Sequence, residues 1–395
     1  MDQKEFDKRE SIWSVPFVIL LLANFFQSTA AFTANTTIPL YIDSMGATAG
    51  IVGIIVGAFA ITALLIRPFA GPAFDSFSRK KLLMIAQGVN ALAFVLYGFV
   101  DSIPLFFMVR LLHGIGIGCS GPLAMSLVSE YLPLRKFATG LSVYSLAQTF
   151  AQVFGPGAGL WLIEVIGFQG TYLIAAALLI LTVISISRVE ELPRERPPYQ
   201  LRLGRMFAKE ALDKALVVML FSISFGGIIS YLVLYGTKLG IENLGMYFVV
   251  YALCLLVTRP IYGRLADTFG AERVLVPGVI AFAISYIMLA HATNFGELMG
   301  VAAVGALGFG ACMPLVQSLA MASVPTERRG AASNTIFTGM DIGMLVGPFF
   351  AGSAIEMLQP ITGSLLSAYS HMWYVMLIPM GIAFLIIIWW NIKKK

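Results

Sequence analysis

The chain has 395 residues, of which 58% are apolar and only 12% charged, with a formal net charge of +5. Mean hydropathy is +0.85. So few charges cannot cover the surface of a soluble protein of this length, which excludes an ordinary soluble enzyme and also the disordered and disulfide-stapled classes. The composition indicates a polytopic membrane protein.

Twelve apolar segments follow one another, each near the roughly 20 residues that cross a bilayer as a helix. The expected spans are 14–40, 47–70, 81–100, 104–128, 138–163, 170–187, 215–236, 244–264, 273–291, 296–322, 331–356 and 370–391. Most connections are short, but one long segment is rich in charge and proline. We therefore expect an N-terminal six-helix bundle at 1–187, a cytoplasmic linker at 188–214 and a C-terminal six-helix bundle at 215–395.

The Lys and Arg residues between the spans indicate the orientation, because they accumulate on the cytoplasmic side. Nearly all of them fall on the side that holds both termini and the linker, and Lys238 alone lies on the other. We expect both termini to be cytoplasmic in a multi-pass protein of the cell (cytoplasmic) membrane. Trp13 and the pair Trp389–Trp390 lie at inner ends of spans, where tryptophan anchors helices to the interface.

The two halves repeat each other in a single register. The spacing from Arg67-Pro68 to Arg259-Pro260 also relates Gly155-Pro156 to Gly347-Pro348. Both copies begin on the same side of the membrane, so they are parallel repeats, an arrangement that suits alternating access to a site between them.

Two motifs carry a family resemblance. After the second span the chain has Gly71-x-x-x-Asp75 followed by a basic cluster that begins with Arg79, and after the eighth it has Gly263-x-x-x-Asp267. The chain resembles a transporter of the major facilitator superfamily, in its proton-coupled drug and metabolite exporter branch. That resemblance implies an all-α fold of two six-helix repeats and a cytoplasmic conformational latch formed by Gly71, Asp75, Arg79, Gly263 and Asp267. The alternative is a tight turn with topology-setting charges.

A second motif lies in the fourth span, where Arg110 is followed by His113 and a glycine-rich stretch. It resembles a signature frequent in proton-coupled members, which implies a coupling role for both side chains. A cation inside a span costs about 2.5–3.5 kcal/mol on insertion scales, so it is normally turned inward and used. The alternatives are that Arg110 extends to the outer headgroups and that His113 is a polar packing residue.

Asp341 is the acidic residue deepest within a span, about ten residues, or roughly 15 Å, into the eleventh. Its repeat counterpart is Thr149, so the fold does not demand a carboxylate there. We expect Asp341 to bind a proton or a substrate cation; a structural hydrogen bond is the alternative. The counterparts Glu164 and Glu356 lie near outer helix ends, which suggests an architectural or gating role.

The fifth span contains Gly155, Pro156 and Gly159, and the eleventh contains Gly347 and Pro348. Small residues allow helices to approach closely, so we expect a helix-packing motif in both halves. The motif of the fifth span resembles the Gly-Pro signature of antiporters, which favours export.

In the family, cavity-lining residues often fall on the first, fourth, seventh and tenth spans. That resemblance selects the substrate-binding candidates Asn24, Gln27, Asn35, Arg110, Tyr231 and Gln317. Such a polar, weakly basic cavity suits small anionic or zwitterionic solutes better than cations.

These observations predict a secondary active transporter of a small organic solute, expected to be an exporter that exchanges substrate for protons. The alternatives are an importer or uniporter of the same fold, and a transporter-like membrane sensor. No nucleotide, nucleophile or metal motif is present, so we expect no enzyme, cofactor or metal site. The expected partners are the substrate, protons and the lipid bilayer, with no nucleic acid and a monomeric state.

Overall fold

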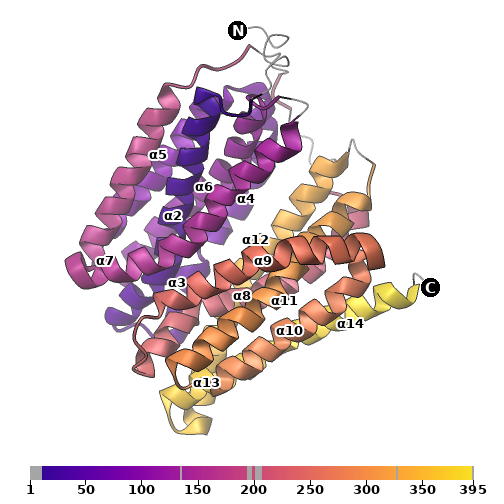
Figure 1. Cartoon of the computed structure of the whole chain (residues 1–395). Coiled ribbons are helices and arrows are strands. Elements are labelled where there is room, and N and C mark those ends of the chain that lie inside the picture. The colour runs from indigo at the N-terminus through magenta and orange to yellow at the C-terminus, as the bar shows by residue number, and fades with distance from the viewer. Residues whose placement is uncertain (1–10, 134–135, 194–197, 201–206, 326–327, 394–395) are drawn as a thin grey trace. The chain divides into compact units, whose positions relative to one another are not determined.

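A computed structural model of the chain describes residues 11–133, 136–193, 198–200, 207–325 and 328–393. Within those ranges the regular elements are all helices (Figure 1). In chain order they are α2 (Val15–Ser44), α3 (Ala49–Gly57), α4 (Phe59–Ser76), α5 (Arg79–Tyr97), α6 (Ile103–Ser129), α7 (Phe137–Ser187), the 3-10 turn η3 (Lys209–Ala211), α8 (Leu212–Lys238), α9 (Gly245–Phe269), α10 (Ala271–His291), α11 (Phe295–Ala322), α12 (Arg329–Thr362), α13 (Leu365–Val375) and α14 (Leu377–Lys393).

Eleven helical stretches of the described chain are long and apolar enough to cross a membrane. One of them belongs to α7, which consists of two helices joined across a kink and includes both the fifth and the sixth expected spans. The two parts meet at Gly167, whose φ of 72° glycine adopts without strain. The fifth and sixth expected spans are therefore separated by one residue with a positive φ and not by a loop. Twelve membrane crossings and cytoplasmic termini remain a prediction.

The chain forms two compact units. Unit 1 comprises Met1–Thr37 and Ala58–Leu201, and unit 2 comprises Ile38–Gly57 and Arg202–Lys395. The early segment Ile38–Gly57, which includes α3, thus packs with the helices that follow the linker, mainly with α12.

Unit 1 is built around α6, which packs against both α4 and α5. At one end of the unit, Phe17, Leu20, Leu83 and Leu127 are buried together in an apolar core. Further along α6, a side chain at Gly114 would collide with the carbonyl oxygen of Phe59 on α4. The close approach of α4 and α6 therefore requires glycine at this position, and it places the aromatic ring of Phe59 beside α6.

Unit 2 is built on the packing of α8 against α12. The α12 residues Gly339, Gly343 and Gly347 face the α8 backbone so closely that a methyl group on any of them would collide with a main-chain oxygen of α8. A row of small residues is how helices approach each other within a membrane, where burial of apolar surface gives little driving force. This row fixes the position of α12 and of Asp341 between its first two glycines.

Candidate substrate and proton sites

A buried basic and aromatic cluster lies in the middle of unit 1. Arg110 on α6 is 0% exposed and His113, one turn further, is 2% exposed. The Arg110 guanidinium carbon lies 4.8 Å above the ring of Phe59 on α4. Tyr97 on α5 is also completely buried. Arg110 therefore does not extend to a solvent-exposed position; its charge is held inside the bundle by a cation–π contact and hydrogen bonds.

The ring nitrogen Nδ1 of His113 receives two contacts. The Tyr97 hydroxyl lies 3.1 Å from it, and an Nη of Arg110 lies 3.4 Å from it. Arginine can only donate hydrogen bonds, so Nδ1 must present its lone pair and the proton of the neutral ring resides on Nε2. This geometry favours the polar-packing alternative for His113, because a second positive charge next to Arg110 would be repelled.

A second polar cluster in unit 1 consists of amides and one hydroxyl. Gln27 of α2 donates to Ser120 Oγ of α6 at 2.6 Å, and Gln87 of α5 donates to Gln27. Asn90 of α5 lies 3.4 Å from Gln87 and 3.5 Å from Ser120 through its Nδ2. Its Oδ1 is buried and has no hydrogen-bond partner among the described residues. Asn90 therefore retains an unused acceptor beside Gln27, which is one of the substrate-binding candidates.

Gln87, Asn90 and Ser120 are not among the site residues predicted from the sequence. A signal was present, because two amides three residues apart in the third span must share one helix face. Buried amides are costly unless they are hydrogen-bonded or used, so this spacing could have added the third span to the candidate site.

Asp341 is the buried carboxylate of unit 2. It is 5% exposed and lies on α12 between the glycines that contact α8. The repeat counterpart on α7 is Thr149, which is equally buried at 6% and bonds its own helix by donating to the Ser145 carbonyl at 3.4 Å. The two units therefore place different chemistry at the same position of the repeat.

The other substrate-binding candidates lie in different surroundings. Asn24 is half-buried and its amide donates to the Tyr144 carbonyl of α7 at 3.1 Å. Asn35 on α2 and Gln317 on α11 are half-buried. Tyr231 on α8 is 0% exposed.

Tyr231 takes part in the packing of α3 within unit 2. Its hydroxyl lies 2.5 Å from the carbonyl oxygen of Ala49 and 3.2 Å from that of Pro348 on α12. Beside it, Glu356 of α12 accepts the Gly50 backbone N–H at 3.0 Å. A carboxylate at the first turn of a helix is stabilised by the exposed N–H groups there. The start of α3 is therefore held by one carboxylate and one phenol.

The latch candidates are described only in part. For Gly71 and Asp75 the structure describes the backbone alone, so their contacts lie outside what it describes. Arg79 forms an ion pair with Glu130 at 2.8 Å and donates from Nε to the Phe74 carbonyl at 3.1 Å. In unit 2, Gly263 and Asp267 are exposed. The visible role of Arg79 is to join the start of α5 to the end of α6.

The helix-packing motif of α7 faces α2. Thr33 donates to the Gly155 carbonyl at 2.9 Å, and a side chain at Gly155 or Gly159 would press on Thr29, Thr33 or neighbouring α2 atoms. Pro156 is buried between them. In unit 2, Gly347 and Pro348 of α12 contact α8 in the same way.

The family model of the Major Facilitator Superfamily matches residues 20–248 and 215–394. The staphylopine export protein of Staphylococcus aureus is 28% identical over 261 residues, which is 62% of this chain and 64% of that protein. The multidrug resistance protein MdtG of Escherichia coli is 24% identical over 362 residues, covering 87% of this chain and 88% of MdtG.

Solved structures share the fold. An inward-facing, occupied bacterial homologue of the human lysosomal transporter Spinster has a TM-score of 0.78 at 17% identity, covering 94% of this chain and 95% of the other. A point mutant of the nucleoside transporter NupG has a TM-score of 0.77 at 14% identity, covering 94% of this chain and 99% of the other. At such identities the likeness shows the fold alone.

Proposed function

This chain belongs to the Major Facilitator Superfamily, and from that premise we propose that it exports a small organic solute across the cytoplasmic membrane in exchange for protons. The observation that carries the proposal is a pair of buried ionisable centres, Arg110 in unit 1 and Asp341 in unit 2. Ionisable groups within membrane spans are costly and mark substrate or ion pathways.

Proton coupling requires a group that changes charge within the membrane. Arg110 stays charged at any physiological pH, so it cannot release a proton itself. Asp341 can, because a carboxyl group binds and releases a proton when alternating access exposes it to each aqueous phase in turn. Asp341 is therefore assigned the proton, and Arg110 the stabilisation of negative charge during the cycle. His113 orients Arg110 through its Nδ1.

Export is favoured by the names of the relatives, an export protein and a multidrug resistance protein. The resemblance of the segment from Gly155 to Gly159 to the Gly-Pro signature of antiporters favours the same direction. The latch role of Asp75, Arg79 and Asp267 is part of the same proposal.

The substrate class proposed is a small anionic or zwitterionic organic solute. Arg110 supplies a fixed positive charge in unit 1, and the amide cluster of Gln27, Gln87 and Asn90 supplies donors and one unused acceptor. Neutral amides can bind both a carboxylate and an ammonium group, whereas the arginine disfavours cations.

The test is substrate-driven proton movement in proteoliposomes that contain a pH-sensitive dye. A panel of amino-carboxylates, nucleosides, organic anions and cationic drugs is added in turn, with and without a protonophore. We expect at least one zwitterion or anion to drive proton flow that the protonophore abolishes. Movement of labelled solute without protons would contradict coupling, and a response restricted to cations would contradict the substrate class.

A further inference from the structure

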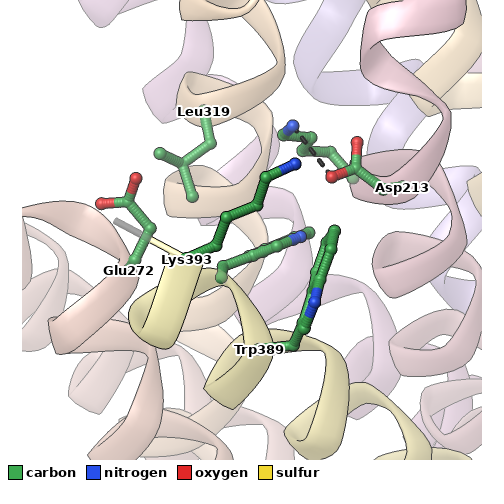
Figure 2. A pocket seen from close by; sticks show the side chains of 7 residues that line it. Asp213, Glu272, Leu319, Trp389 and Lys393 are labelled. Atoms are coloured by element: carbon green, nitrogen blue, oxygen red, sulfur yellow. Dashed lines mark hydrogen bonds and ion pairs between the residues drawn. The ribbon is translucent and has the colours of Figure 1, made fainter. Parts of the chain in front are cut away.

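A pocket of about 280 Å³ lies in unit 2, and neither Arg110 nor Asp341 is among the residues that line it. Its lining comes from four helices and comprises Asp213, Lys214, Glu272, Leu319, Trp389, Trp390 and Lys393. Figure 2 shows Lys393 extending its ammonium group into the pocket, with Glu272 on one side and Asp213 on the other. None of these residues belongs to the proposed substrate or proton sites.

The pocket contains both signs of charge next to aromatic rings. The Lys214 ammonium lies 2.9 Å from an Asp213 carboxylate oxygen and 5.6 Å from the centre of the Trp390 ring. The Lys393 ammonium lies 5.1 Å from the centre of the Trp389 ring. Two lysines and two carboxylates balance each other, so a bound molecule with no net charge matches the pocket best.

One polar group in the pocket wall lacks a partner. Trp390 is 8% exposed, and its Nε1 is buried without a hydrogen-bond partner among the described residues. An unsatisfied buried N–H costs free energy that an acceptor in the pocket would recover. An oxygen atom of a bound molecule that reached this N–H would lie in a pocket that Lys214 and Lys393 also line.

The position of the pocket indicates where that oxygen comes from. Trp389 is 52% exposed and Ile392 is 67% exposed, so the outer wall of α14 presents apolar surface. Tryptophan and lysine at the end of a membrane helix lie at the level of lipid headgroups. This is the helix end that the distribution of Lys and Arg assigns to the cytoplasm.

We propose that this pocket binds the headgroup of a zwitterionic phospholipid with a primary amine, such as phosphatidylethanolamine. The phosphate accepts hydrogen bonds from Trp390 Nε1 and Lys393, and the lipid ammonium lies on the carboxylate side of the pocket. The acyl chains run along the exposed surface of α14. This proposal rests on the predicted orientation of the chain in the membrane. It does not rest on the direction of transport or on its coupling to protons.

The experiment measures lipid retention by native mass spectrometry of the full-length protein, purified from bilayers of phosphatidylethanolamine, phosphatidylglycerol and phosphatidylcholine in equal parts. We expect preferential retention of phosphatidylethanolamine. Trp390→Phe keeps the ring and removes the N–H, and should weaken retention about threefold to tenfold, as expected for one lost hydrogen bond. Lys393→Gln should weaken it by at least as much, because the lost bond is charge-assisted.

Trp161→Phe is the matched control, since that ring is 60% exposed on α7 of unit 1 and lies outside the pocket. It should leave retention unchanged. Equal retention of the three lipids, or no effect of Trp390→Phe, would overturn the proposal. Preference for phosphatidylglycerol would identify an anionic-lipid site instead. Soluble phosphoethanolamine is the last arm: if it competes at micromolar concentration, the pocket binds a free phosphate compound rather than a lipid.

Discussion

The two repeats place charge on different helices. In unit 1, α5 and α6 carry Tyr97, Arg110 and His113, whose counterparts in unit 2 are Leu289, Ala302 and Gly305. Leu289 and Ala302 are completely buried, as Tyr97 and Arg110 are. The same helix pair therefore folds with an apolar centre in one unit and a cationic centre in the other.

On the helices α7 and α12 the charged side chain lies in unit 2 and the neutral one in unit 1. Unit 1 has Thr149 where unit 2 has Asp341, and both side chains are buried. The fold accepts a neutral side chain at each of these positions, so neither the cation nor the carboxylate is required by helix packing. A charge that packing does not need, and that burial makes costly, points to a task in transport.

The largest effect on transport is expected from Asp341→Asn. This variant replaces the carboxyl group by a neutral side chain, as at the counterpart Thr149 in unit 1. The amide cannot ionise, so proton movement driven by solute in proteoliposomes should fall to background. Binding of the same solute should persist, because the shape of the side chain is kept. Asp341→Glu is the control, since it retains a titratable carboxyl group and should retain part of the proton movement. Proton movement at the parental rate in the Asn variant would make Asp341 structural.

The second-largest effect on transport is expected from replacing Arg110, the buried cation of unit 1. Arg110→Lys should lose nearly as much transport as Arg110→Ala, because a lysine cannot lie flat on Phe59 while donating to His113 Nδ1. The two variants are compared by transport rate at equal amounts of folded protein. If Lys restores transport to the Arg level, only a positive charge is needed and the proposed geometry is wrong.

The apolar runs alone predicted the helical membrane fold and most helix positions. An apolar run of about 20 residues is long enough to cross a bilayer as a helix, and a helix satisfies its own backbone hydrogen bonds there. The break within α7 was harder to place, because a single positive φ at Gly167 separates its two parts while the helix on either side continues. Sequence patterns do not distinguish such a residue from the middle of a short loop.

The residues themselves indicated the candidate site where a side chain is rare in a membrane, and the family resemblance added neutral side chains such as Gln27. Arg110 and Asp341 are conspicuous because charge in a span is costly. Gln87 and Asn90 were missed because neutral amides are common at helix interfaces, and their partners Gln27 and Ser120 come from helices far away in sequence. Three-dimensional structure is needed to show that these side chains meet.

A smaller effect is expected from the helix contact that surrounds Arg110. Gly114 corresponds to Ala306, which is buried in unit 2. Gly114→Ala should destabilise the protein by about 1–3 kcal/mol, because the added methyl would meet the Phe59 carbonyl and the Thr62 hydroxyl. Thermal unfolding of the purified protein measures this. Gly121→Ala on the same helix has open space around it and should be neutral or slightly stabilising; a similar loss in both variants would point to general helix strain.

The smallest effect concerns the outer carboxylates Glu356 and Glu164, which are counterparts in the repeat and both exposed. Glu356 accepts the Gly50 N–H at the start of α3, so its negative charge interacts favourably with the helix N-terminus. Glu356→Gln keeps an acceptor oxygen but removes the charge, and should cost about 0.3–1 kcal/mol of stability, with the loss diminishing as salt is added. Glu164→Gln is the matched control and should change stability by less than that. If the two variants unfold at the same temperature at low salt, the charge of Glu356 contributes nothing to holding α3. If Glu356→Gln alone shifts the unfolding temperature, and the shift disappears in high salt, the two outer carboxylates differ in function although the repeat places them at the same position.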